Sequence, residues 1–350
     1  MKRSILFIVL SMCVVSAFAQ VLSTVDAALV YYMPKTLLAF EVNYVETTRT
    51  QGPFYQYAER YLGAKDVVTE DETVFELSSV AIHTKTIADK ERAFTFNPSR
   101  SQQADLTLNK QGLLVAYNAE APEEGTKNTS FSSKGRSSKD KKQAEDNLTP
   151  FTEEMLLATS KAKMAESTAK QIYRLREARV NILAGDVDHL PADGRAMELT
   201  LKELDEQEAK LVKLFTGTVE TKHLHKLIYV EPTEDESRLL LRFSRFAGPV
   251  ETDNLSGEPI KVELRVMKQE LKPAGEKEKA PALSDIYYNL PGEVDVKVTD
   301  ATGKMLAEKT LPVAQFGVSV ALTKDLINRK PRIIFDTQTG AILSISEANK

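Results

Sequence analysis

The stretch Leu38-Ala39-Phe40-Glu41-Val42-Asn43-Tyr44-Val45 decides the fold class, because a large apolar side chain occupies every second position from Leu38 to Tyr44. Alternation with a period of two places these side chains on one face of a β-strand, as in a sheet with one buried face. Shorter runs of the same kind follow as far as Tyr117, with one short helix between Gly52 and Gly63. We therefore expect an N-terminal β-rich domain over residues 20–117.

A helical period replaces this alternation between Thr152 and Thr216. Apolar residues three and four positions apart predict a first helix from about Thr152 to Ala184, and Asp193 is a suitable cap for a second. Together they predict an antiparallel two-helix hairpin over residues 151–216. The first helix is the longer, so its overhanging start, Met155-Leu156-Leu157, is expected to pack against a β domain. Antiparallel packing is also expected to place Arg174 and Arg176 near Glu203 and Glu206.

Strand patterns return after Gly217, in short runs separated by turn residues. Many short strands of this kind are typical of a sandwich or a partly closed barrel, so a C-terminal β-rich domain is expected over residues 217–350. Residues 118–150 are rich in Glu, Lys, Ser and Asn, which predicts a flexible polar linker. The predicted fold class is α+β and multi-domain: two antiparallel β-rich domains with the helical hairpin inserted between them.

Three turns between apolar runs end in glycine: Asn109 to Gly112, Asp300 to Gly303, and Thr337 to Gly340 directly after Asp336. An Asn or Asp side chain caps such a turn, and the glycine accepts the positive φ that reverses the strand. We interpret all three as hairpin tips. This interpretation assigns Asp300 and Asp336 to turns and not to a ligand site.

The first nineteen residues have the organisation of a secretory signal: Lys2 and Arg3, an apolar run, and then Ala17-Phe18-Ala19. We expect removal of residues 1–19, a mature chain that starts at Gln20, and a periplasmic or outer-surface location. Lipid attachment at Cys13 is the alternative, which Met12 disfavours because a small residue is needed there. Cys13 is the one cysteine of the chain, so the mature protein would have no thiol for disulfides, zinc or catalysis.

Charge and hydropathy limit the classes of partner. The chain has 46 Lys and Arg against 50 Asp and Glu, which argues against a nucleic acid partner, since such binding needs clustered positive charge. After the signal, no apolar run approaches the roughly 20 residues of a membrane-spanning helix. An envelope protein or a glycan is the expected partner.

Sequence motifs for catalysis are not found. The chain has no phosphate-binding loop, no G-x-G-x-x-G motif and no H-E-x-x-H motif. Ser319 lies in Gly317-Val318-Ser319-Val320-Ala321, which lacks the last glycine of a nucleophile elbow and has no helix directly behind it. We therefore interpret Ser319 as a strand residue, and the sequence identifies no catalytic residue and no cofactor.

Metal-binding patterns are equally incomplete. His223 and His225 share one face of a predicted strand, but no third ligand is identified; the remaining histidines are His83 and His189. Asp186, Asp188 and Asp193 follow a calcium loop only in part, because Leu190 and Pro191 occupy a ligand and a glycine position. No metal ligand is therefore predicted.

Several stretches together resemble one family: Val30 to Thr36, Gly52 to Gly63, Arg176 to Asp188, Leu204 to Gly217, and Leu311 to Gly317 ahead of Phe335-Asp336. The chain is similar to the exported Bacteroidetes-type proteins grouped as domain of unknown function 4831. The similarity covers nearly the whole mature chain except residues 118–147. It implies export and one shared architecture, and it implies no activity and no functional residues.

Two functions remain open on the sequence. The first is a non-enzymatic envelope protein that binds or braces another protein or a glycan. The alternative is a glycan-acting hydrolase that uses two carboxylates, since Asp and Glu can perform acid–base catalysis without a cofactor. A cleft with two carboxylates roughly 5–10 Å apart and raised pKa values would favour the alternative.

Overall fold

The computed structural model describes residues 28–97, 105–120, 152–187, 193–268 and 285–347. Its elements follow in chain order: β1 (Leu29–Thr50), η1 (Tyr55–Tyr57), α1 (Ala58–Leu62), β2 (Glu72–Phe96), β3 (Leu106–Leu108), β4 (Leu114–Tyr117), α2 (Glu153–Leu156), α3 (Lys161–Ala184), α4 (Gly194–Thr216), β5 (Thr218–Val230), β6 (Glu236–Ser244), β7 (Gly248–Val250), β8 (Glu258–Lys268), β9 (Tyr287–Thr299), β10 (Met305–Ala321), α5 (Lys324–Asn328), β11 (Arg332–Phe335) and β12 (Ile342–Ser346). The predicted signal, residues 1–19, and nearly all of the predicted linker lie outside the described residues.

The strands form three antiparallel sheets, with the orders β2-β1-β5, β10-β9-β8-β6-β7 and β12-β11-β4-β3. The prediction of antiparallel β structure accompanied by helices is confirmed. The strand pattern that opens the chain is also confirmed, because Leu38, Phe40 and Val42 are fully buried on one face of β1.

Two apolar cores fill the β part. The first core lies between the three-stranded and the five-stranded sheets and includes Phe40, Val80 and Val296. The second core lies against the four-stranded sheet and α5 and includes Tyr31, Phe96 and Ile333. Each of β1, β2 and β9 contributes side chains to both cores, and Leu322, directly after the end of β10, belongs to the second core.

The structure does not confirm a division into two β-rich domains at residues 20–117 and 217–350. β5 pairs with β1 from Leu38–Val230 to Thr50–Thr218, and β11 pairs with β4 at Ile333–Tyr117. Strands that follow the helices thus extend the sheets of the N-terminal strands at their edges, and the five-stranded sheet covers the apolar face of β1 and β2. Neither predicted region buries its own core alone.

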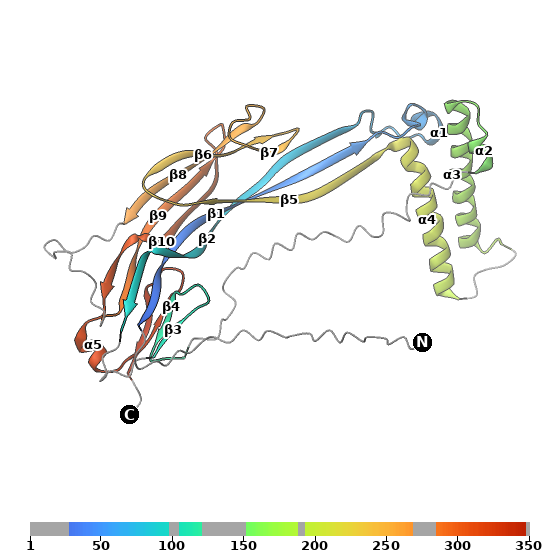
Figure 1. The fold of residues 1–350 in the computed structure, drawn as a ribbon. Helices are drawn as coiled ribbons and strands as arrows, with labels where there is room; N and C mark the ends of the chain where they lie inside the picture. Colours follow the sequence, from blue (N-terminus) through green and yellow to red (C-terminus); the bar gives the residue numbers. More distant parts are fainter. Residues whose placement is uncertain (1–27, 98–104, 121–151, 188–192, 269–284, 348–350) are drawn as a thin grey trace, which may run out of the picture.

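β1, β2 and β5 extend together beyond the five-stranded sheet and carry α1 to α4 at their far end (Figure 1). We call residues 47–50, 72–74 and 218–221 of these strands the arm, and η1 with α1 to α4 the helical tip. The tip has an apolar core of its own, which includes Phe54, Met155, Ile172, Leu211 and Phe215. The arm thus separates the core of the tip from the two cores of the β part.

The start of the predicted first helix needs a correction. The chain forms α2 and then α3, and Ser160 caps α3 by accepting a hydrogen bond from Lys163 N. Met155 is buried in the core of the tip, whereas Leu156 and Leu157 are 66% and 71% exposed. The prediction that these three side chains pack against a β domain is wrong, because the break before Ser160 lets α2 place Met155 against the other helices.

Ion pairs join α3 to α4. The Arg176 Nε lies 2.7 Å from a Glu208 carboxylate oxygen, and the Arg179 Nη1 lies 2.9 Å from one of Asp205. The partner number falls as the Arg number rises, which is the order expected of antiparallel helices. The acidic partners on α4 are therefore Glu208 and Asp205, and not the predicted Glu203 and Glu206. Asp193 caps α4 as predicted, since its carboxylate accepts from Ala196 N at 2.7 Å.

Candidate functional site

The predicted hairpin tips are confirmed at Asp300. Its carboxylate accepts hydrogen bonds from the Thr302 hydroxyl at 2.7 Å, from Thr302 N at 2.8 Å and from Lys304 N at 3.0 Å. The Thr302 hydroxyl, helped by the two amides, holds the pKa of the Asp300 carboxyl below its ordinary value. Gly303 adopts a φ of 84°, which a side chain would strain.

Asp336 has the same kind of role in its turn. Its carboxylate accepts from Gln338 N at 2.9 Å and from the Thr339 hydroxyl at 2.6 Å. Asn109 likewise accepts from Gln111 N and Leu113 N. The polar groups that the sequence marks at these turns are used within the turns.

The three histidines that the structure describes do not converge. His223 and His225 lie exposed on β5, opposite Val45 and Asn43, and His83 lies on β2 with its Nε2 3.5 Å from a Glu41 carboxylate oxygen. No group of three or more His, Cys, Asp or Glu within the described part of the chain could hold a metal ion. His189 and Asp188 lie outside the described residues, and Asp193 is used as the cap of α4.

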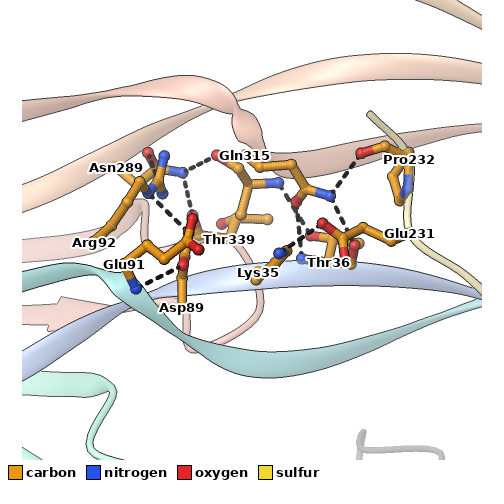
Figure 2. Close-up of polar contacts among 11 residues, drawn as sticks. Lys35, Thr36, Asp89, Glu91, Arg92, Glu231, Pro232, Asn289, Gln315 and Thr339 are labelled. Carbon is orange, nitrogen blue, oxygen red and sulfur yellow. Dashed lines mark hydrogen bonds and ion pairs between the residues drawn. The ribbon is translucent and has the colours of Figure 1, made fainter. Parts of the chain in front are cut away.

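A cluster of polar side chains, in which Thr36 and Asn289 are buried, joins four strands, and sequence reasoning missed it. We call it the polar joint and define it by Thr36, Arg92, Asn289 and Gln315 (Figure 2). These residues come from β1, β2, β9 and β10. Ser319, which the sequence analysis places in a strand, lies in β10 opposite Asn289.

Asn289 is fully buried on β9 and reaches three elements. Its Nδ2 donates to the Ala314 carbonyl at 2.9 Å and to the Thr339 carbonyl at 2.8 Å. Its Oδ1 accepts from the Arg92 Nη2 at 3.5 Å. A buried carboxamide with its donors and acceptor occupied is a stabilising contact, whereas an unpaired one would be costly.

Gln315 continues the hydrogen bonding of β1 after β5 has ended. The last residue of β5, Val230, is opposite Leu38. At Thr36, the Gln315 Oε1 accepts from the backbone N and the Gln315 Nε2 donates to the backbone O, both at 2.9 Å. The same Nε2 donates to the Pro232 carbonyl at 3.2 Å, and Ala314 N donates to the Thr36 hydroxyl at 3.0 Å.

Charged side chains surround the joint in pairs. The Lys35 Nζ lies 2.6 Å from a Glu231 carboxylate oxygen, which raises the pKa of Lys35. The Arg92 Nε lies 3.4 Å from an Asp89 carboxylate oxygen. Burial lowers the pKa of the Arg92 guanidinium, and the Asp89 charge opposes that shift. Each of these positive side chains therefore has a negative partner within the same chain.

Close packing beside the polar joint also explains why position 317 is a glycine. A Cβ at Gly317 would overlap the Leu290 carbonyl oxygen on the neighbouring strand. Gly317 and Gln315 both lie in the stretch Leu311 to Gly317 that carries part of the family resemblance. The signal in the sequence is a glutamine between apolar residues, but its partner Thr36 is 279 positions away.

A small hollow lies beside the joint. Tyr32, Pro34, Tyr287 and Tyr288 line it together with Asp336 and Gly340. Asp336 is the one carboxylate in this lining, and its oxygens already accept hydrogen bonds within the turn. The two-carboxylate geometry that a glycosidase needs is therefore not found in this hollow.

The helical tip presents apolar side chains to solvent. Beside Leu156 and Leu157, the exposed large side chains of α3 and α4 are Tyr173, Val180, Leu183 and Leu199. The Tyr173 hydroxyl donates to the Tyr61 carbonyl at 2.6 Å and so ties α3 to α1. Exposed apolar side chains of this kind supply area for contact with another molecule. Among the described helices, none is long and apolar enough to cross a membrane.

Comparison with curated proteins and with solved structures gives no match. A family model described as Domain of unknown function (DUF4831) matches residues 27–343, which confirms the predicted resemblance to that domain family. The match spans both β cores, the arm and the helical tip. The chain therefore belongs to this family.

Proposed function

We propose that the protein is an exported cell-envelope protein that acts as a non-enzymatic binding or structural module, with the helical tip as its contact surface. The observation that carries the proposal is the arm, which holds a separately packed helical core beyond the β part (Figure 1). Exposed leucines on that tip, Leu156 and Leu157 above all, supply apolar area for a partner. Export is supported by the signal pattern of residues 1–19.

A comparison of variants tests the contact surface. The full chain would be used to capture partners from an envelope extract and on a glycan array. The double variant Leu156→Glu, Leu157→Glu is expected to lose the captured partner, because it replaces exposed apolar area with charge. Leu255→Glu is the matched control, since Leu255 is 80% exposed on the β part. Equal capture by both variants and the original chain would contradict the role of the tip.

A mass measurement tests export separately. We expect the protein isolated from envelope fractions of its own cells to begin at Gln20, without residues 1–19. A chain that keeps Met1 and fractionates with the cell interior would contradict the localisation, whatever the helical tip binds. An N-terminal lipid on Cys13 would instead support the lipoprotein alternative.

The glycan-acting hydrolase was the alternative from the sequence. It calls for a cleft with two carboxylates whose pKa values are raised. The hydrogen bonds to Asp300 and the Lys170 partner of Glu166 lower the pKa values of these two carboxyl groups instead. No observation on the described residues favours this alternative, so we do not propose it.

A further inference from the structure

The polar joint lies where the chain passes from one β core to the other. β1 contributes Met33 to the second core and Leu38 to the first, and β9 passes from Tyr287 to Val294. The register between β1 and β2 shifts between Tyr32 and Met33, and that between β9 and β10 shifts between Val313 and Val318. Such bulges interrupt the ladder and bend the strands. Two strand pairs are thus irregular beside the same joint.

At the polar joint, side chains make hydrogen bonds to the backbone where strand-to-strand hydrogen bonds are interrupted. The Gln315 carboxamide bonds to both backbone groups of Thr36 in the manner of a neighbouring strand, and it reaches Pro232 as well. Asn289 bonds to Ala314 and Thr339, and so connects β9 to β10 and to the turn before β12. A change in the angle between the two cores would separate these pairs. It would then leave buried amide groups without partners, which is unfavourable.

We infer that the polar joint is a lock that fixes the angle between the part of the molecule around the second core and the part that carries the arm. The strands alone would bend at their bulges. Gln315 selects one bend by bonding to backbone groups of Thr36, which have no strand partner after β5 ends, and Asn289 does so by bonding to Ala314 within the bulge of β10. This inference goes beyond the proposed function, because it concerns the direction of the arm and holds whatever the tip binds.

The test measures a distance across the joint with spin labels on the full chain. Cys13 would be replaced by serine, and labels attached at Ser344→Cys on β12 and Thr221→Cys on the arm, where both residues are exposed. About 15 residues of β1 separate the two levels, which at about 3.3 Å each gives a separation of roughly 50 Å, within reach of pulsed electron resonance. In the labelled chain with an unchanged polar joint, we expect one narrow distribution of label-to-label distances.

Gln315→Met keeps the length of the side chain and removes its three hydrogen bonds. A second distance population or a shifted mean is expected for this variant, with the circular dichroism spectrum retained. Gln338→Met is the matched control, because Gln338 is exposed in a hairpin turn, and its distance should stay unchanged. An unchanged distance in folded Gln315→Met would overturn the inference. If that variant does not fold, Thr36→Val replaces it with the same expectation, and an unchanged distance there counts equally against the lock.

Discussion

Asn289 shows at the scale of one residue how a buried polar side chain connects distant segments. Its carboxamide holds Ala314, Thr339 and Arg92, which belong to three different parts of the chain. Its neighbours in sequence are apolar or aromatic, so the local pattern marks a strand and not a hydrogen-bonded centre. The stabilising effect is therefore visible only in three dimensions.

Replacing Asn289 by alanine is expected to destabilise the protein strongly. The change leaves two buried carbonyl groups without their donor, so the free energy of unfolding should fall by about 3 kcal/mol. Denaturant unfolding followed by circular dichroism would measure the loss. Asn254→Ala is the control: Asn254 is exposed and accepts one turn hydrogen bond, from Ser256 N, so its loss should stay below about 1 kcal/mol. Equal losses for the two variants would contradict this account of Asn289.

The turn at Asp300 should respond to acid. The pKa of its carboxyl is lowered in the folded protein, so the stabilisation of the turn is present when the carboxylate is ionised. That stabilisation should be lost as the pH falls from about 4 through the lowered value, because protonation removes the acceptor. Amide exchange of Thr302 and Lys304, corrected for its intrinsic pH dependence, would report the opening. Asp300→Asn keeps an acceptor oxygen without titrating, so its protection should not follow pH in this range.

The sequence predicts the role of a residue whose partners are local, but not that of a residue whose partners are distant. Asp300 uses partners within four positions, so its role in a turn can be predicted from local chemistry. Gln315 and Thr36 are 279 positions apart, so no local pattern connects them. The family resemblance includes the stretch with Gln315, but it assigns no role to that residue.

Elements were predicted well in type and less well in extent. β1 and β2 have 22 and 25 residues, because each continues through both cores and into the arm. β10 runs without interruption from Met305 to Ala321, although its bulge between Val313 and Val318 contains Gln315, which interrupts the apolar pattern. The pattern of two strands and the pattern of one bulged strand look the same in a sequence.

At Gly52, the chain before η1 lies close against the backbone of α4. A Cβ at Gly52 would overlap the Leu214 carbonyl oxygen, which accepts a hydrogen bond from Phe54 N at 2.8 Å. Gly52→Ala is expected to loosen the contact between η1 and α4, and to lower the melting temperature of the helical signal. Gly194→Ala is the control, because nothing lies within 4 Å of its Cβ position and alanine favours a helix. A melting temperature unchanged by Gly52→Ala would contradict the close approach.

The core of the tip predicts a contrast between neighbouring side chains. Met155 is fully buried, so Met155→Ala should lower the free energy of unfolding of the tip by about 3 kcal/mol through lost packing. Leu157→Ala, at 71% exposure, should change it by less than about 0.5 kcal/mol. Hydrogen exchange of α3 and α4 amides would separate the two. Similar effects would mean that α2 does not pack as described.

At the scale of the whole molecule, the order of the chain does not follow the order of the cores. The strands before the helices and the strands after them build both β cores jointly, so the helical tip is inserted at the end of an arm and not between two domains. Composition and periodicity identify each segment type, but they carry no information on which distant strands pair. For that reason the sequence led us to expect separate β-rich domains. It could not predict that strands before and after the helices build both cores together.

Small-angle X-ray scattering tests the separation of tip and β part most directly. A compact chain of this length would have a radius of gyration of about 20 Å. The arm predicts a value clearly above that, together with a shoulder at long distances in the pair-distance distribution, from vectors between the β part and the helical tip. A radius of about 20 Å with one symmetric peak would contradict the account, because the helices would then lie against the β cores.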